Sequence, residues 1–339
     1  MPGNARAGHT PRFTAYSAQL PSTTSAFVFA QYGCQAPTRA AASDAAALLR
    51  ESFAEADGPT LVDRGSFVDT AGEHNVVWLV YWPDPDRYRR WAASGRVRSR
   101  WDALPGEGTV GHWREACVIP AGHAETLHTH RREDYATSGL VQAVEVRETL
   151  THDYWGAARD RIPASAESEL APEMPVYTPR PADTRGRRLS VEVPGNVALI
   201  RTAQDWSAST LYRETYLRDV KPVKDRGVDF LAQHADSGCI AARNVDEEAA
   251  DGTALDRACT VAWFASLEHL MTWCKSHRTH LDIYASFFQM VGGGEGPLDV
   301  AFWHEVSVLP AGAVTAEYVN CHPMTGFLPL ADRHTALTH

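Results

Sequence analysis

The chain has 339 residues, of which 44% are hydrophobic, and it carries a formal net charge of −10 at pH 7. This length and apolar content are enough for one large domain or two ordinary ones. The acidic balance and the lack of a long Lys/Arg cluster argue against nucleic acid and anionic membranes as partners, so we expect a small-molecule ligand.

The first 24 residues lack the apolar centre of a secretory signal, and no apolar run reaches the length of a membrane span. We therefore expect a cytoplasmic protein in which residues 1–24 form a mobile segment. The six cysteines show neither close pairs nor the C-x-x-C-H pattern of covalent haem attachment. We interpret them as reduced thiols of the core, which implies neither structural zinc nor a c-type haem.

In chain order, the first predicted strand covers residues 26–33, which are rich in β-branched and aromatic side chains, and an Ala-rich helix follows at 40–56. A weak strand pair, a Trp-bearing helix and a strand ending in proline complete this set. A second set begins with a strand at 196–203, and its long helix at 209–233 contains Pro222, which should kink or divide it.

The two sets repeat one pattern. VVWLVYWPDPDRYRRWAAS (76–94) corresponds to CTVAWFASLEHLMTWCKSH (259–277), and GHWREACVIPAG (111–122) corresponds to AFWHEVSVLPAG (301–312). Each set has the order β-α-β-β-α-β of a ferredoxin-like unit. We therefore predict an α+β fold in which duplicated ferredoxin-like units form one barrel with outer helices and enclose one cavity between them. The expected organisation is a first half at 25–145, a connecting excursion at 146–195, a second half at 196–330 and a C-terminal tail at 331–339.

A polar difference between the two repeats points to chemistry. Arg114 of the first repeat corresponds to His304 of the second. Strand alternation places His304 on the same face as Phe302 and Val306, so this imidazole is predicted to point into an apolar surface.

A second histidine lies on the preceding helix. In SHRTHLDIYASFFQM (276–290), His280 falls on one helical stripe with Tyr284 and Phe287. The sequence therefore predicts that His280 and His304 approach the same cavity from a helix and from the next strand.

The two histidines allow more than one interpretation. A single inward histidine is more often a hydrogen-bonded core residue than a ligand. Zinc or non-haem iron would require at least a third ligand, whereas haem needs only one proximal histidine and leaves the other free. His277 could compete as a ligand, but at the helix start we expect it to be solvated. The cluster of His123, His128 and His130 is predicted to scatter over a loop or strand end.

Five stretches follow one another along the chain in a recognisable order: HDYWGAARDRIP (152–163), GNVALIRTAQDW (195–206), SHRTHLDIYASFF (276–288), FWHEVSVLPA (302–311) and EYVNCHPMTG (317–326). Together they resemble the haem-containing aldoxime dehydratases, the phenylacetaldoxime dehydratase family. The likeness runs from about residue 25 to 328.

This resemblance implies a hydro-lyase that converts an aldoxime to a nitrile with haem b, ferrous in the active form. It places the proximal haem ligand on His280 and the distal catalytic histidine on His304. The catalytic arginine falls on Arg161 and a cavity glutamate on Glu125. The family's distal serine falls on Thr202, which is a departure.

Further expectations follow from the same resemblance. Phe302 is predicted to line the substrate pocket. A second departure is Arg278, where the family commonly has proline. A homodimer is expected because paired ferredoxin-like barrels often associate.

Three alternatives stay open. The first is a haem enzyme resembling dye-decolourising peroxidases or chlorite dismutases, which the inward His304 disfavours. The second is a family member acting on another N-hydroxylated substrate, as the Thr202 departure suggests. The third is a non-catalytic haem-binding barrel with bis-histidine iron.

Overall fold

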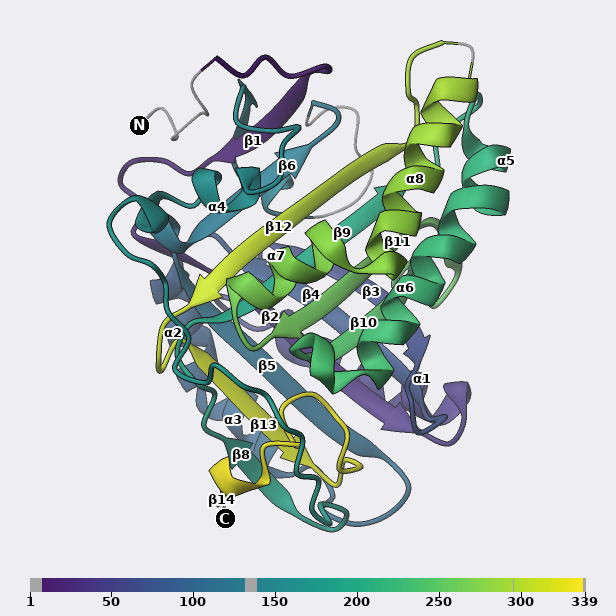
Figure 1. The fold of residues 1–339 in the computed structure, drawn as a ribbon. Coiled ribbons are helices and arrows are strands. Elements are labelled where there is room, and N and C mark those ends of the chain that lie inside the picture. The colour runs from purple at the N-terminus through teal and green to yellow at the C-terminus, as the bar shows by residue number, and fades with distance from the viewer. Residues whose placement is uncertain (1–7, 132–138, 295, 338–339) are drawn as a thin grey trace.

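The computed structural model describes residues 8–131, 139–294 and 296–337, and one sheet of 14 strands runs through this part of the chain (Figure 1). The strand order is β14-β8-β13-β5-β2-β4-β3-β10-β11-β9-β12-β6-β1-β7. The strands are β1 (Ala15–Gln19), β2 (Ala26–Ala36), β3 (Leu61–Val68), β4 (His74–Trp82), β5 (Gly111–Pro120), β6 (Ala124–His128), β7 (Glu145–Thr149), β8 (Arg188–Val191), β9 (Val197–Asp205), β10 (Cys239–Glu248), β11 (Ala254–Phe264), β12 (Ala301–Leu309), β13 (Val314–Val319) and β14 (His334–Ala336). The α-helices are α1 (Arg39–Phe53), α2 (Pro85–Ala93), α3 (Gly95–Asp102), α4 (Ala157–Arg161), α5 (Arg213–Thr215), α6 (Lys221–Gln233), α7 (Leu267–Ser276) and α8 (Arg278–Gly293).

The sheet contains two groups of four neighbouring strands, β5-β2-β4-β3 and β10-β11-β9-β12, which join where β3 pairs antiparallel with β10. Helices α1, α2 and α3 pack on the first group through small and aromatic side chains such as Ala46, Trp91 and Trp101. Helices α6, α7 and α8 lie in front of the second group in Figure 1. An antiparallel sheet with segregated helices confirms the predicted α+β class.

The other faces of the two strand groups share one core. Leu79 and Trp113 from the first group and Leu199 and Trp263 from the second belong to the same buried cluster. Buried ion pairs lie in the same region, including Arg243–Glu115 at 2.6 Å and Arg201–Asp63 at 2.8 Å. The prediction that His280 and His304 face a cavity between the halves is therefore wrong, because side chains and ion pairs fill this interior.

Local sequence explains how the second helical layer is built. Pro222 lies in the first turn of α6, directly after a π-helical turn at Tyr216–Val220. The sequence predicts that Pro222 kinks or divides the long helix, but helical backbone runs without a break from Arg213 to Gln233, so division is wrong and the local distortion is the π turn. Gly227 lets α8 approach α6 closely, because a Cβ added there would lie 2.7 Å from Ile283 Cδ1.

Both chain ends depart from the predicted organisation. The described part of the segment 1–24 includes β1, which pairs with β6 and β7, so the expectation of mobility is wrong for this strand. Residues 1–7 lie outside the described residues. In the C-terminal tail at 331–339, β14 pairs with β8. Such short strands near the ends of the sheet have weak sequence signals, because tertiary pairing rather than local propensity forms them.

The strand pairings also cross the predicted boundary between halves. β6 lies in the first half of the sequence but pairs with β12 of the second half. β13 lies in the second half but pairs with β5 of the first. The two halves therefore exchange edge strands, and this brings first-half residues to the site described below.

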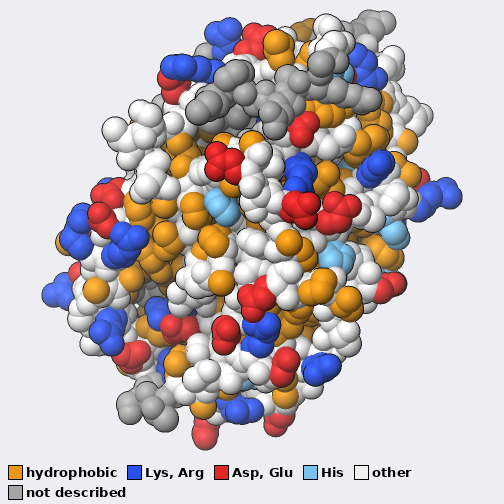
Figure 2. Space-filling view, turned by 60° about the vertical axis from the view of Figure 1, so that its left-hand side comes forward, with side chains coloured by type: hydrophobic (Ala, Val, Ile, Leu, Met, Phe, Trp, Pro, Cys, Tyr) orange, Lys and Arg blue, Asp and Glu red, His pale blue; other side chains and the backbone are white. Residues whose placement is uncertain are grey.

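All six cysteines lie in described residues and are free thiols, as the sequence predicts, and five of them are buried. No helix in the described ranges combines the length and apolarity needed to cross a bilayer. On the face drawn in Figure 2, Lys and Arg side chains are interspersed with Asp and Glu.

Candidate active site

The strand register brings several predicted site residues to one face of the sheet. His304 on β12 lies opposite Thr202 on β9. On the other side of β12, Val306 lies opposite Glu125 of β6. Val306 belongs to a cluster with Leu267 of α7, so this face of the sheet is the one that the helices cover. The predicted orientation of His304 is thus confirmed, but toward the helical layer. We call this face of β9, β12 and β6 the sheet wall.

Arg161 reaches the sheet wall from the last residue of α4. Its Nε donates to Glu125 Oε2 at 2.6 Å, its Nη1 donates to the Thr151 carbonyl oxygen at 2.6 Å, and its Nη2 lies 3.1 Å from His304 Nε2. The turn into α4 uses Gly156 at φ 104°, a conformation that favours glycine. A residue 36 positions from Glu125 therefore completes a compact cluster of carboxylate, guanidinium and imidazole.

Glu125 is the charged centre of this cluster. Its side chain is fully buried, and Oε1 lies 3.0 Å from His304 Nε2. Burial acts to raise the pKa of Glu125, but Arg161 and then His304 outweigh it and hold the pKa below its usual value. A neutral Nε2 of His304 can accept from Arg161, and a protonated Nε2 can donate to Glu125. The cluster can therefore stabilise both proton states of the imidazole.

Thr202, on which the resemblance places the distal hydroxyl, lies opposite His304 in the strand register, but its hydroxyl is already engaged. Oγ1 donates to the carbonyl oxygen of Trp303 at 3.1 Å, across the β9–β12 pair. The methyl group and the stiff β-branched side chain restrict the directions that Oγ1 can take. The lone pairs of Oγ1 remain able to accept a hydrogen bond.

His280 lies in the first turns of α8, and its surroundings suit a metal ligand. Its Nδ1 is buried without a hydrogen-bond partner, and burial lowers the pKa of the ring to about 4. The imidazole is therefore neutral at pH 7, which is the form that binds iron. Its ring lies 4.8 Å from that of Trp273 and 6.2 Å from that of Trp155.

Helix α8 faces the sheet wall across an aromatic contact. Phe287 of α8 and Phe302 of β12 meet edge to face, with ring centroids 5.0 Å apart. The helix and the strand run in opposite directions (Figure 1). His280 precedes Phe287 by seven residues, or about 10 Å along the helix axis. His304 follows Phe302 by two residues, or about 7 Å along the strand, in the same direction. His280 therefore lies near the level of His304. We call α8 the helix wall.

The helix wall does not pack tightly on the strand that it faces. Helix α8 makes most of its contacts with α6, α7 and the π turn. Beside His280, the large aromatic side chains of Trp155 and Tyr284 are 47% and 41% exposed. Exposed aromatic side chains beside a half-buried, neutral imidazole fit a haem bound between the two walls.

Other predicted candidates do not join this site. His277 caps α8, bonds Thr279 Oγ1 through Nδ1 and stacks on Phe230, so it is engaged rather than solvated as expected. His123 Nδ1 contacts the Val308 carbonyl, whereas His130 Nε2 contacts the Leu298 carbonyl. Within the described ranges, no group of three metal-binding side chains is found.

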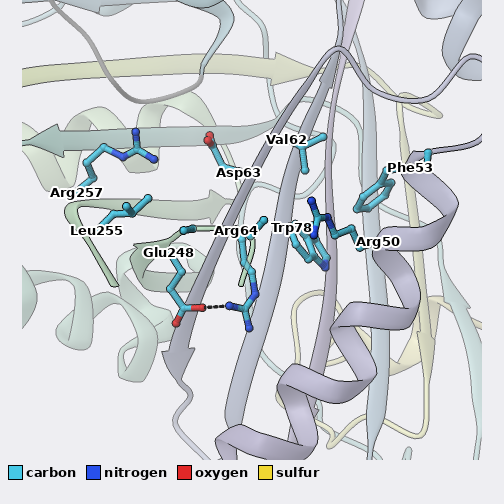
Figure 3. A pocket seen from close by; sticks show the side chains of 12 residues that line it. Arg50, Phe53, Val62, Asp63, Arg64, Trp78, Glu248, Leu255 and Arg257 are labelled. Atoms are coloured by element: carbon cyan, nitrogen blue, oxygen red, sulfur yellow. Dashed lines mark ion pairs between the residues drawn. The ribbon is translucent and has the colours of Figure 1, made fainter. Parts of the chain in front are cut away.

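A hollow of about 440 Å³ lies beside the junction of β3 and β10 (Figure 3), and none of the predicted site residues lines it. The Arg64–Glu248 ion pair at 2.6 Å lines it, and Trp78 forms part of its wall. Glu248 also accepts from Arg39 and Ser66, each at 2.5 Å. Because its buried charges compensate one another, this hollow offers less chemistry than the walls described above.

The half-buried His280 on the helix wall, and His304 with its carboxylate and guanidinium partners on the sheet wall, are the side chains expected of a haem enzyme that transfers protons. The model of the haem-containing dehydratase family matches residues 28–327. The chain belongs to this family, and haem is therefore its cofactor, as the sequence predicts.

Curated relatives and solved structures agree with this assignment. The chain is 37% identical to the phenylacetaldoxime dehydratase of Bacillus sp. (strain OxB-1), over 97% of this chain and 93% of that protein. It is 35% identical to the aliphatic aldoxime dehydratase of Pseudomonas chlororaphis, over 91% and 88%. A crystal structure of an aldoxime dehydratase superposes with a TM-score of 0.86 at 31% identity, covering 97% of this chain and 94% of the other. Another, an aldoxime dehydratase in complex with butyraldoxime, gives 0.87 at 29% identity, covering 97% and 93%.

Sequence reasoning alone would have missed part of the site. Glu125 and Arg161 were named only through the family resemblance, because neither stands in a local motif that implies catalysis. Trp155 and Trp273, which flank His280, were not predicted as site residues. Trp273 could have been suspected, since it lies seven residues before His280 on the preceding helix.

Proposed function

We propose that the protein is an aldoxime dehydratase that converts R–CH=N–OH to R–C≡N and water. The observation that carries the proposal is the contact of His304 Nε2 with both Glu125 and Arg161, opposite the helix that bears His280. The names of relatives that are 33–37% identical support the same reaction. The elimination leaves carbon and nitrogen without net redox change, so its chief requirement is proton transfer to a poor leaving group.

His280 would hold the haem through Nε2, because Nδ1 is the buried nitrogen. The chemistry that bound ferrous haem supplies is electron donation to the oxime nitrogen, which weakens the N–O bond. Trp155 and Trp273 would pack against the ligand ring and restrict its rotation. Burial keeps this imidazole neutral, and thus ready to bind iron, well below pH 7.

His304 would deliver a proton to the departing hydroxyl and then accept the proton from carbon. Among the described residues, Nδ1 of His304 makes no hydrogen bond, so one nitrogen is available to the substrate while Nε2 stays with Glu125 and Arg161. Glu125 would accept from the Nε2–H of the protonated ring, and also from the Nε2–H of the neutral ring that remains when Nδ1 gives up its proton. Arg161, which donates to Glu125, would keep this carboxylate ionised. Nδ1 is thus free to give and then accept the proton.

The remaining wall residues would orient the substrate. Thr202 offers a hydroxyl oxygen beside His304, and Arg161 adds positive charge near the developing hydroxide. Phe302 and Phe287 would supply apolar surface that limits water between the two walls. Because Thr202 stands where the family has serine, an N-hydroxylated substrate other than a simple aldoxime is the second candidate.

We also propose that the fold arose from duplicated ferredoxin-like units in one barrel. The orders β5-β2-β4-β3 and β12-β9-β11-β10 support this, because each reads fourth, first, third and second strand of its own set. A homodimer and a cytoplasmic location remain predictions, and light scattering of the purified protein would test the first.

Two variants test the function. We expect His280→Ala to lose haem, whereas His304→Ala retains haem and substrate binding but forms no nitrile. Haem content, the shift of the Soret band on adding an aldoxime, and nitrile formation under anaerobic reducing conditions measure the three properties. An active His304→Ala protein removes this residue from the mechanism. Turnover that requires peroxide would instead favour a peroxidase-like enzyme.

A further inference from the structure

The chain before β1 continues along the segment that follows β7. The antiparallel register pairs Ala15 with Thr149, so residues 9–13 run beside residues 150–154. His9 Nε2 lies 2.8 Å from the carbonyl oxygen of His152. The ring of His9 also meets that of Tyr154 edge to face at 4.9 Å.

Arg12 is the centre of this contact. Its Nε and Nη2 donate to the two carboxylate oxygens of Asp153 at 2.7 and 2.5 Å, and its backbone N–H donates to the same carboxylate at 3.1 Å. The Asp153 side chain is 4% exposed, and its backbone adopts φ 64°. A bidentate pair to a buried carboxylate is geometrically specific, unlike most surface ion pairs.

Arg12 also contacts the helix wall. Its Nη2 donates to the Tyr284 hydroxyl at 3.4 Å, and its guanidinium lies 5.2 Å from the centre of the Phe288 ring. Tyr284 lies one turn after His280 on α8. One side chain therefore joins the segment around Asp153 to the helix that carries the proposed iron ligand.

The segment at 151–155 in turn contacts the helix wall and Arg161, whose guanidinium bonds Glu125 of the sheet wall. The Thr151 carbonyl accepts from Arg161 Nη1 at 2.6 Å, which helps to orient that guanidinium toward Glu125. Trp155 lies 6.2 Å from the His280 ring and 5.6 Å from the Tyr284 ring. Displacing this segment would therefore disturb the packing around His280 and the acceptor of Arg161 together.

We propose that Arg12 is a positioning residue that ties the 151–155 segment to α8 and thereby holds the two walls at the spacing that retains haem. The proposal deepens the proposed function, because it rests on haem lying between these walls. Arg12 acts through Asp153 and Tyr284 rather than by touching the reacting atoms.

The test measures haem loss from the holoprotein to excess apomyoglobin, followed by the Soret band, without any aldoxime. We expect Arg12→Ala to release haem on the order of threefold to tenfold faster than the unsubstituted protein at low salt. Asp153→Asn tolerates the positive φ and should give the same acceleration, and Arg12→Ala with Asp153→Asn should give no more. Arg12→Lys keeps the positive charge but loses the bidentate pair with Asp153, so its haem-release rate should be intermediate.

The matched control is Arg147→Ala, which removes the Arg147–Glu145 ion pair of the same strand pair, at 2.9 Å, and has no contact with α8 among the described residues. Its haem release should equal that of the unsubstituted protein. Salt of about 0.5 M should speed release from the unsubstituted protein and leave Arg12→Ala unchanged, because a 63% exposed guanidinium is screened.

Equal release from Arg12→Ala and the unsubstituted protein would overturn the proposal, and so would additive effects of the Arg12 and Asp153 substitutions. If Arg12→Ala proves unstable on heating, Asp153→Asn and Arg12→Lys decide. Failure to dehydrate aldoximes would count against the proposed function and leave the haem-release result standing. Normal aldoxime turnover by the unsubstituted protein, together with unchanged haem release from Arg12→Ala, would support the proposed function and overturn the role of Arg12.

Discussion

Replacing His280 with alanine should make the haem-free protein less sensitive to acid. Burial lowers the pKa of His280 to about 4 from an ordinary value of 6.5. As the pH falls through this window, the unfolded chain binds a proton that the folded chain refuses. Burial of neutral His280 therefore does not change the free energy of unfolding above about pH 6.5. It lowers that free energy progressively as the pH falls toward 4, and the loss grows no further below pH 4.

The size of the effect follows from those two values. At about pH 5 the unfolded imidazole is almost fully protonated and the folded one is mostly neutral, which costs roughly 2 kcal/mol of folding free energy. At about pH 7.5 the cost is close to zero. The buried rings of His112 and His128, whose pKa values are also lowered, contribute in both proteins and cancel in the comparison.

The assay is urea unfolding of the two apoproteins at about pH 7.5 and about pH 5. The unsubstituted apoprotein should lose roughly 2 kcal/mol more than His280→Ala between these conditions. His234→Ala, which removes an exposed histidine of the same helical layer, is the matched control and should behave like the unsubstituted protein. Equal acid sensitivity of His280→Ala and the unsubstituted apoprotein would refute the view that this ring is held neutral by burial.

Two further outcomes are expected at the sheet wall. Glu125→Gln removes the charge that stabilises protonated His304 and leaves Arg161 uncompensated. Nitrile formation per bound haem should therefore fall about 100-fold while haem content is kept. Unchanged turnover would exclude a role for this carboxylate. Thr202→Val keeps the shape but loses the hydroxyl, so turnover should fall about tenfold. Thr202→Ser should remain active, and kcat measured on both variants separates the loss of the oxygen from the loss of the methyl group.

Periodicity was sufficient to predict the direction of His304, because a strand allows only two faces and the residues beside it are apolar. It could not say which layer that face meets. The interior between the halves is filled by pairs such as Arg243 and Glu115, which bond to each other although they lie 128 positions apart in the chain. Strand alternation carries no information about such long-range pairs.

The cluster around Glu125 shows the same limit. Its position depends on β6 crossing to pair with β12, and on α4 returning Arg161 to that strand. Family resemblance named both residues, whereas local patterns did not. The contacts of Arg12 had no sequence signal, because its partners Asp153 and Tyr284 are brought near by the pairing of a short edge strand and by the placement of α8.

Arg114 corresponds to His304 in the first repeat and also faces helices. In the first repeat, however, the helices pack directly against this residue. Its guanidinium lies 4.4 Å from the Trp101 ring centre and pairs with Glu317 at 2.8 Å. Trp91 and Trp101 fill the space between these helices and the first strand group, where a porphyrin would have to lie. The first repeat therefore provides rigid packing, and only the second provides a site. The stoichiometry should accordingly be a single equivalent of tetrapyrrole per polypeptide.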